Sequence, residues 1–411
     1  MNADQPGEGS TMNTIRWAAY LGCSWTWCIG MFFPALILRD FGIAGYMIFA
    51  IPNVLGAALM GWVLTTKNQS IKMVRDHAAA VGWFSVITIA FHVFWIVWLF
   101  GFAQAMLPIP EGYLFGAGAV AVAWTVVTGR GVRMGRESQL AIVLWIASAA
   151  ILIATFVYPD AISPKTTEVI ANINNESILS TGIIWLIPLS VLGFALNPYL
   201  DATFHHGRQQ LGSTKNSRIG FTLGFGIMFA SMIVLTFQYS GLIIETLNGN
   251  AEAITIHPLM GAAILAHIMC QWIFTVRVHL ARLPLLPKGG PPLQLTYGLA
   301  IASGIVALLV PQIAHHAGLS AGEIVYRNYL GAYGLLFPAY VLYRIVRARK
   351  GGRPTKNLYL YLAIGIAAPM FWMGFIEGHT PWLTIGIVLL IAMAFVPNTR
   401  ANKRTKPQTS D

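Results

Sequence analysis

Charged residues are scarce in this 411-residue sequence, at 10% of the chain, whereas hydrophobic residues make up 56%. A soluble domain usually carries about 25% charged residues. A larger core cannot hide the difference, because single hydrophobic cores stop growing at about 250–300 residues. The scarcity of charge therefore excludes an ordinary soluble protein and indicates a chain that lies in a lipid bilayer.

Cysteine is also rare. The three cysteines, Cys23, Cys28 and Cys270, lie inside apolar stretches, where a thiol acts as a small hydrophobic side chain. The sequence has no Gly-x-x-x-x-Gly-Lys-Ser/Thr run and no His-Glu-x-x-His run. Nothing therefore predicts a nucleotide-driven pump or a zinc enzyme, and we expect a protein that is not an enzyme and has no resident cofactor or metal.

Long apolar stretches follow one another along the whole chain, each long enough to cross a membrane as a helix. They lack the alternation of apolar and polar residues that a membrane β-barrel requires. The predicted fold class is therefore an all-α polytopic membrane protein with about 12 transmembrane helices. The predicted spans are 14–38, 42–65, 78–102, 113–129, 138–158, 180–205, 218–240, 257–281, 294–314, 325–346, 357–376 and 380–397.

The basic residues predict which side of the membrane each loop faces. With the N-terminus inside, all but three of the 26 Lys and Arg residues lie on the cytoplasmic side; the exceptions are Arg39, Lys165 and Arg327. The net charge of +11 is therefore a topology signal, and no nucleic-acid partner is expected. We predict a multi-pass protein of a cell membrane, of the prokaryotic inner-membrane kind, with both termini cytoplasmic.

No boundary between separate domains is visible. We expect a disordered cytoplasmic N-terminus over residues 1–12, one transmembrane domain over 13–397 and a basic cytoplasmic tail over 398–411.

Two of the predicted spans are interrupted near their midpoints, as in many secondary transporters. In the sixth span, Pro198 removes a backbone donor within the run from Gly193 to Asp201. In the first span, small and hydroxyl residues lie between Gly22 and Gly30. An offset of five helices reverses the orientation, which predicts inverted repeats over about 14–158 and 180–346, followed by extra helices over 357–397. The alternative is that Pro198 only kinks the sixth helix for packing.

Twelve helices, cytoplasmic termini and breaks in helices 1 and 6 resemble the LeuT fold of the amino acid–polyamine–organocation superfamily. The run Asn197-Pro198-Tyr199-Leu200 is similar to the sixth helix of divalent-metal transporters of this fold, but the first span has no Asp-Pro-Gly-Asn run. Sodium symporters of the fold carry paired hydroxyls on the eighth helix, which here offers Thr275. The resemblance implies alternating access around two broken helices, with Na+ or H+ as the coupling ion.

The candidate substrate-binding residues cluster at the two breaks. The indoles of Trp25 and Trp27 lie too deep for an interfacial belt, so they either bind a cationic group or pack against neighbouring helices. Asn53, with Gly56 and Gly61, is interpreted as a site of close helix packing. The full candidate set is Ser24, Trp25, Thr26, Trp27, Phe194, Asn197 and Tyr199.

Ionisable side chains deep in a membrane are costly and point to function. Asp201 and His205 lie four residues apart, on one helical face, and form a candidate proton relay or cation site. In the alternative, Asp201 caps the half-helix that follows it or pairs with Arg208. The other buried histidines are either coupling groups or neutral core histidines. The candidate coupling residues are Asp201, His205, His92, His267 and Thr275.

The sequence thus predicts a secondary active transporter of a small polar or charged solute, such as an amino acid, an amine or a cation. Two alternatives stay open: a membrane-embedded redox or enzyme subunit that uses intramembrane histidines, and a membrane sensor or scaffold that transports nothing. The expected partners are the lipid bilayer and a small solute. The sequence does not set the oligomeric state.

Overall fold

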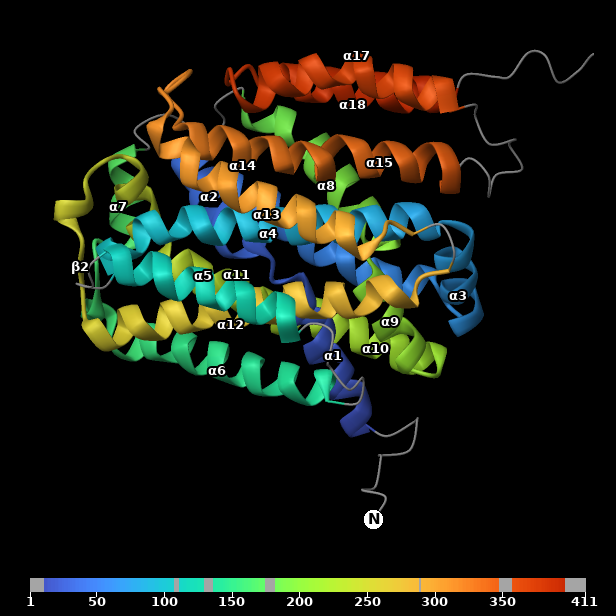
Figure 1. Ribbon diagram of the computed structural model, residues 1–411, viewed down its shortest axis with the longest axis horizontal. Helices are drawn as coiled ribbons and strands as arrows, with labels where there is room; N and C mark the ends of the chain where they lie inside the picture. The colour runs from blue at the N-terminus through green and yellow to red at the C-terminus, as the bar shows by residue number, and fades with distance from the viewer. Residues whose placement is uncertain are drawn as a thin grey trace, which may run out of the picture.

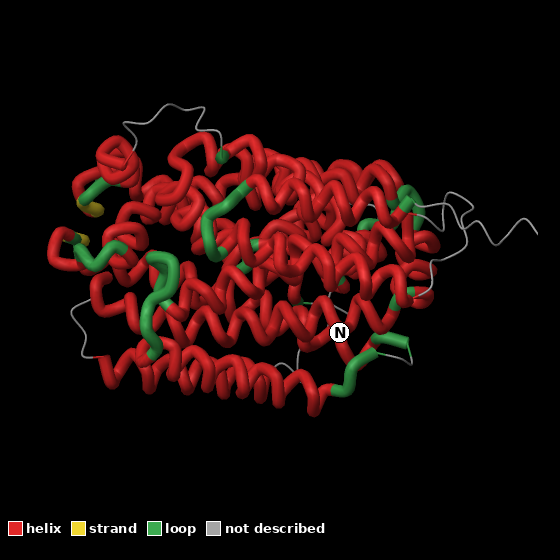
Figure 2. Tube along the Cα trace, turned by 90° about the horizontal axis from the view of Figure 1, so that it is seen from above, coloured by secondary structure: helices red, strands yellow, loops and turns green. Residues whose placement is uncertain are grey.

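The computed structural model describes residues 11–106, 111–128, 136–173, 182–287, 290–346 and 357–395. Most helices run along the long axis of the molecule, with loops at its two ends (Figure 1, Figure 2). Within these ranges, nine helical stretches are long and apolar enough to cross a membrane. The chain is therefore an all-α polytopic membrane protein. Residues 1–10 of the predicted N-terminal tail, and all of 398–411, lie outside the described residues.

Helices coincide with all twelve predicted spans. The α-helices are α1 Thr11–Trp25, α2 Cys28–Val63, α3 Lys67–Asp76, α4 Ala78–Met106, α5 Glu111–Thr128, α6 Glu137–Val157, α7 Thr166–Ile173, α8 Ile187–Leu196, α9 Ala202–Gln210, α10 Thr214–Leu223, α11 Ala230–Leu247, α12 Pro258–Arg282, α13 Leu293–Leu309, α14 Ala321–Gly331, α15 Phe337–Tyr340, α17 Asn357–Phe375 and α18 Pro381–Ala394. Short 3-10 helices are η2 Pro159–Ala161, η3 Ile183–Leu186, η4 Asn197–Leu200, η6 Ala251–Ala253, η7 Leu283–Leu285 and η8 Val310–Gln312, and π-helical segments are η5 Gly224–Phe229, η9 Ala332–Leu336 and η10 Val341–Val346.

The first two predicted spans are divided differently from expectation. Helix α1 ends at Trp25, and α2 then continues from Cys28 through the second predicted span to Val63. The chain turns inside α2 at Gly42, whose φ of 59° and ψ of −158° glycine adopts far more readily than other residues. The first span is therefore α1 together with the part of α2 before Gly42.

The sixth span is interrupted one turn later than its proline. Helix α8 passes into η4, in which Pro198 occupies the first turn, where its missing N–H removes no helical hydrogen bond. The chain becomes extended at Asp201, with ψ 113°, and α9 begins at Ala202. The break predicted around Pro198 is therefore present, and it is centred on Asp201.

The two ends of the molecule carry different elements. The strands β1 Ile162–Ser163 and β2 Thr255–Ile256 pair antiparallel, with Ile162 opposite Ile256. They lie at the end that also holds α7, whereas α3, α9 and α10 lie at the opposite end (Figure 1). The loops of one membrane side are thus separated from those of the other.

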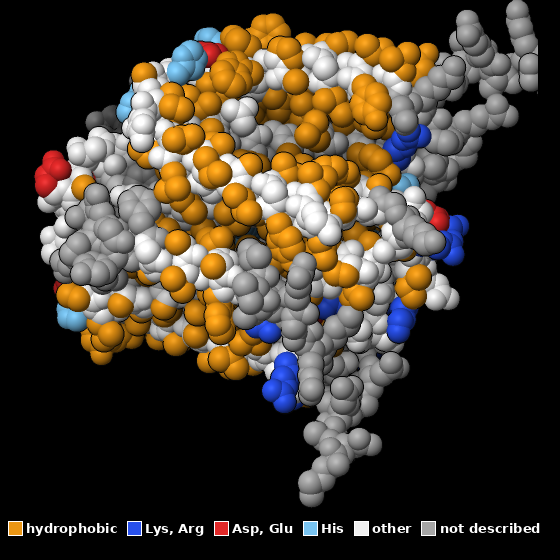
Figure 3. Space-filling view, viewed as in Figure 1, with side chains coloured by type: hydrophobic (Ala, Val, Ile, Leu, Met, Phe, Trp, Pro, Cys, Tyr) orange, Lys and Arg blue, Asp and Glu red, His pale blue; other side chains and the backbone are white. Residues whose placement is uncertain are grey.

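The flanks of the molecule are apolar. Exposed side chains include Leu55 and Trp62 on α2, and Val143 and Ile153 on α6. On the face drawn in Figure 3, hydrophobic side chains cover the middle of the molecule between its two ends. Soluble proteins rarely expose patches of this size, so these surfaces contact the lipid bilayer.

Glycines set the closest helix contacts. A Cβ added at Gly56 would lie 2.4 Å from the carbonyl oxygen of Phe194, and one at Gly61 would lie 2.5 Å from the ring of Phe221. Both distances are far below van der Waals contact, so α2 approaches its neighbours only because these positions have no side chain. The close packing predicted at Gly56 and Gly61 is confirmed.

Candidate functional site

The break in the first span leaves the start of α2 only partly capped. Thr26 bonds back to α1, its hydroxyl donating to the Gly22 carbonyl at 2.9 Å. Trp27 is extended, with φ −81° and ψ 175°, and its side chain does not cap α2; His92 Nε2 accepts the backbone N–H of Cys28 at 3.3 Å. The first N–H groups of a helix have no partner within it. The amide of Gly30 is therefore a donor at the positive end of the α2 dipole.

A small cavity lies where the two broken spans meet. Its volume is about 20 Å³, which is room for about one water molecule. Its wall comes from the end of α1, the start of α2, the junction of α8 and η4, and η9. The lining residues are Trp25, Trp27, Ile29, Gly30, Asn53, Phe194, Asn197 and Tyr333. Four of the seven predicted substrate-binding residues belong to this set, and none of the lining side chains is charged.

Half of the lining residues are aromatic. The ring centroids of Trp25 and Trp27 are 4.4 Å apart, and Trp27 lies 5.2 Å from Tyr333. The Trp25 indole N–H donates to Asn53 Oδ1 at 2.6 Å, and that of Trp27 donates to the Ser24 carbonyl. Both indole donors are thus used within the protein, and the rings present their faces and edges.

Asn197 brings an unpartnered acceptor to the cavity. Its Nδ2 donates to the Tyr333 carbonyl at 2.8 Å, which fixes the other amide atom as the oxygen. That oxygen is buried and has no hydrogen-bond partner, and the residue is only 3% exposed. A buried polar atom left in this way costs about 1–3 kcal/mol. A ligand with an N–H group would remove this cost.

Three of the predicted substrate-binding residues lie outside the lining. The Ser24 hydroxyl donates to the Leu21 carbonyl at 3.1 Å, and Thr26 bonds to α1 as described above. Tyr199 contributes its carbonyl oxygen, 3.0 Å from His205 Nε2. The two breaks bring these residues near the site, but their role in binding stays a prediction.

Asp201 caps α9, as the alternative interpretation expected. Its Oδ1 accepts hydrogen bonds from the backbone N–H and the hydroxyl of Thr203, both at 2.7 Å. Its Oδ2 is buried without a partner. The Thr203 hydroxyl also lies 3.2 Å from Ser24 Oγ, which links the two breaks. Arg208 does not pair with Asp201; it donates to the carbonyls of Leu64 and Thr65.

Two of the candidate coupling histidines have both ring nitrogens engaged. His205 Nδ1 lies 2.9 Å from Ser70 Oγ, and its Nε2 faces the Tyr199 carbonyl. His92 Nε2 accepts the backbone N–H of Cys28 at 3.3 Å, so its Nδ1 carries the proton toward the Thr88 carbonyl at 2.7 Å. His92 thereby fixes the start of α2 as a neutral imidazole.

The other two candidate coupling residues lie on α12. His267 Nδ1 lies 2.8 Å from Ser148 Oγ, whereas its Nε2 is buried without a partner. The Thr275 hydroxyl is also buried without a partner. Neither residue lines the cavity, and their coupling role stays a prediction.

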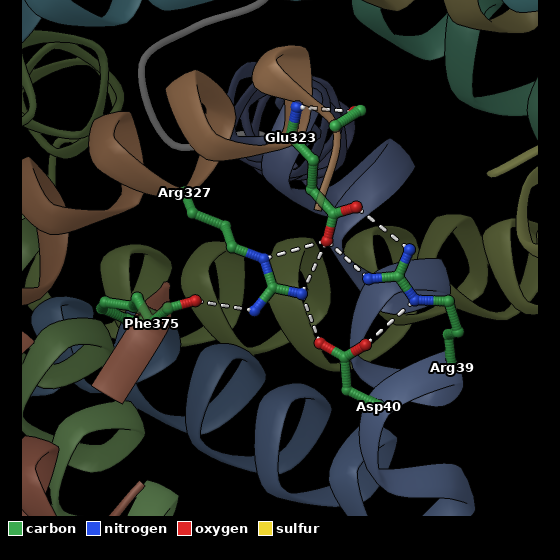
Figure 4. Close-up of polar contacts among 6 residues, drawn as sticks. Arg39, Asp40, Glu323, Arg327 and Phe375 are labelled. Carbon is green, nitrogen blue, oxygen red and sulfur yellow. Dashed lines mark hydrogen bonds and ion pairs between the residues drawn. The ribbon is translucent and has the colours of Figure 1, made fainter. Parts of the chain in front are cut away.

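A network of four charged side chains joins α2 to α14 (Figure 4). Glu323, only 2% exposed, accepts from both Arg39 and Arg327. Asp40 bonds to the same two arginines. Arg327 also donates to the Phe375 carbonyl at the end of α17, at 3.0 Å. The end of α14 that holds Glu323 is thus tied to both α2 and α17.

A second ion pair joins α6 to α12. Arg282 donates to Glu137 Oε2 at 2.6 Å, and the two side chains are 6% and 3% exposed. His206 Nε2 of α9 lies 3.9 Å from the same carboxylate oxygen, too far for a hydrogen bond. The start of α6 and the end of α12 are thus held together, and the second half of the broken sixth span lies beside them.

The predicted substrate-binding set lacks four of the lining residues: Ile29, Gly30, Asn53 and Tyr333. The sequence interpretation gives Asn53 a packing role, although an amide inside an apolar span is itself a signal of a special environment. Tyr333 carries no such signal, because tyrosine is ordinary in a membrane helix. Across the described residues, no three His, Cys, Asp or Glu side chains lie close enough to share a metal ion.

Comparison with known proteins finds no family and no curated sequence that matches the chain. Among solved structures, the chain is similar to a manganese transporter of Eremococcus coleocola, crystallised in complex with an aromatic bis-isothiourea substituted compound. The similarity covers 95% of each chain, at 12% sequence identity and a TM-score of 0.47.

Proposed function

We propose that the protein is a secondary transporter that carries a small solute across the membrane by alternating access. The observation that carries this proposal is the cavity at the meeting point of the two broken spans. Broken membrane helices expose backbone groups that can bind a solute, and they allow each half of a helix to move separately. In this reading the function is transport and not catalysis.

The network on α2 and α14 supports a gate on one side of the cavity. Arg39 and Asp40 lie on α2, the helix that begins at the cavity with Ile29 and Gly30, and they come just before the turn at Gly42. Separation of α14 from α2 would break the bonds of Arg39 to Glu323 and of Arg327 to Asp40, whereas Arg327 and Glu323 would stay paired within α14. A buried charge that loses a partner is costly, so the gate favours the closed state until solute binding offsets that cost.

The pair Arg282–Glu137 supports a gate on the other side. It joins α12 to α6, and His206 of α9 lies 3.9 Å from the same carboxylate. Separation of α6 from α12 would break this pair. With both proposed gates closed and room in the cavity for about one water, the structure fits the occluded state of this transport cycle.

Asp201 is the proposed coupling group, with H+ as the coupling ion. It lies at the centre of the sixth-span break, fully buried, with one carboxylate oxygen unpartnered. Its link through Thr203 to Ser24 joins the ionisable group to the first break. Protonation of Asp201 would therefore change the hydrogen bonds that link the two breaks.

The test is solute counterflow into proteoliposomes that contain the purified full-length protein. The panel covers neutral amides, amino acids, amines and divalent cations, with and without sodium and proton gradients. Saturable counterflow of a panel solute, lost when Asn197 is changed to Leu, supports transport at this cavity. Absence of counterflow for every solute, with the protein folded and monodisperse, would overturn the proposal.

A further inference from the structure

We infer that the cavity takes an uncharged planar ring that carries an N–H next to a carbonyl, the edge found in lactams and cyclic imides. This inference rests on the proposed function and names the substrate class of the same site. It narrows the earlier expectation, which included amino acids, amines and cations.

The lining argues against a solute with an ionised group. All eight lining residues are uncharged. Burial of an ion without a counter-charge costs several kcal/mol or shifts its protonation. The positive end of the α2 dipole and the negative end of the α1 dipole both lie at the break, so the two helix ends together favour neither sign of charge. The cost of burying a cation here therefore opposes its attraction to the aromatic faces.

The polar groups of the lining match a lactam edge. Asn197 supplies an acceptor, because its Oδ1 is buried without a partner while its Nδ2 is held by Tyr333. The first turn of α2 supplies a backbone N–H donor at Gly30, which lines the cavity. An N–H and a neighbouring carbonyl on one solute edge would use both. An ammonium carries three donors, and Asn197 Oδ1 is the one unpartnered side-chain oxygen identified among the lining residues.

The remaining wall suits a flat ring. Trp25, Trp27, Phe194 and Tyr333 surround the polar groups, and aromatic rings favour offset stacking or edge contacts with another ring. The cavity now holds about one water, so the walls must part for a ring to enter. We expect the Trp25–Trp27 pair to separate, because both rings line the space from the break in the first span.

Equilibrium binding to the purified full-length protein tests the inference. Tritiated uracil is the probe, and unlabelled 2-pyridone, N-methyl-2-pyridone, leucine and choline are the competitors. We expect uracil to bind and 2-pyridone to displace it. N-methyl-2-pyridone has the same ring without the N–H, and its affinity should be about tenfold lower or worse, the loss of one buried hydrogen bond. Leucine and choline should not compete.

The matched variants are Asn197→Leu and Asn328→Leu. Both replace an amide by an isosteric apolar side chain, but Asn328 is exposed on α14 and does not line the cavity. Asn197→Leu should weaken uracil binding about tenfold or more, whereas Asn328→Leu should leave it unchanged. Equal affinity for both pyridones, or undiminished binding by Asn197→Leu, would overturn the role of Asn197.

The outcomes separate this inference from the proposed function. Counterflow of leucine, choline or Mn2+ without any binding of uracil or 2-pyridone overturns the neutral-ring assignment while transport stands. Binding of uracil that depends on Asn197, without counterflow of any solute, supports the site and overturns transport.

Discussion

Gly56 fixes how closely α2 can approach α8, and therefore where Phe194 and Asn197 lie. A Cβ at this position would meet the Phe194 carbonyl at 2.4 Å, and a backbone atom cannot rotate away as a side chain can. Gly56→Ala should therefore destabilise the protein by about 1–3 kcal/mol, as overpacking does. It should also weaken solute binding. Thermal unfolding in detergent and equilibrium binding measure the two effects.

Gly365→Ala is the control for this change. Gly365 lies within α17, and a Cβ there would meet nothing within 4 Å. Alanine is a better helix former than glycine by about 1 kcal/mol, so this variant should be as stable as the parent or slightly more so. A stable Gly56→Ala variant with normal binding would contradict the proposed geometry.

Asp201 offers a second test with a single residue. Asn keeps the oxygen that caps α9, and Asn is as good a cap as Asp, so Asp201→Asn should fold normally. It cannot bind and release a proton at neutral pH. Counterflow should therefore persist, while accumulation driven by a proton gradient should be lost. Asp76→Asn, at an exposed position, should leave both unchanged. Gradient-driven accumulation by Asp201→Asn would reduce Asp201 to a helix cap.

The ion-pair network that joins α14 to α2 can be tested by removing its central carboxylate. Glu323→Gln removes the carboxylate that both arginines share. The free energy of unfolding should fall by an amount at the lower end of the range of about 3–5 kcal/mol for a broken buried ion pair. The substitution should also open the cavity toward that side. In a Cys270→Ser background, Ile29→Cys should react faster with a membrane-impermeant thiol reagent when Glu323→Gln is added. Arg75→Gln breaks an exposed pair and should change stability by about 0–1 kcal/mol and leave the reaction rate unaltered.

The turn between α17 and α18 should respond to acid. Glu377 accepts hydrogen bonds from His316 and Trp372, and these bonds lower its pKa in the folded protein. Their stabilisation is therefore present above the unfolded-state pKa of glutamate, about 4.3, and is lost as the pH falls through the lower folded value. Hydrogen-exchange protection of residues 313–319 should decrease in that acid range. Glu377→Gln should abolish this pH dependence, and an unchanged pH profile in that variant would contradict the role of Glu377.

Helices were predictable from sequence because a bilayer demands about 20 apolar residues for each span. The breaks were also predictable, from Pro198 and from the small residues around Ser24. The assembly of the cavity was not. Asn53 and Tyr333 reach it from α2 and η9, and no local pattern tells which distant segments meet. The inverted repeat and the position of the coupling ion stay predictions.

At the scale of the whole molecule, the predicted orientation can be tested by labelling. Lys72 on α3 and Asn248 after α11 are both exposed and lie in loops predicted to face opposite sides. In intact cells of a Cys270→Ser background, an impermeant thiol reagent should label Asn248→Cys, and should label Lys72→Cys only after the membrane is opened. The reverse pattern would invert the topology and exchange the two proposed gates.

The uncharged lining of the cavity has an electrical consequence. A membrane potential does about 2.3 kcal/mol of work on each elementary charge per 100 mV, and none on a neutral solute in a neutral cavity. If the solute is uncharged, any steady current during transport consists of coupling ions alone. The ratio of charge moved to solute moved would then report the coupling stoichiometry directly, and Asp201→Asn should bring it to zero.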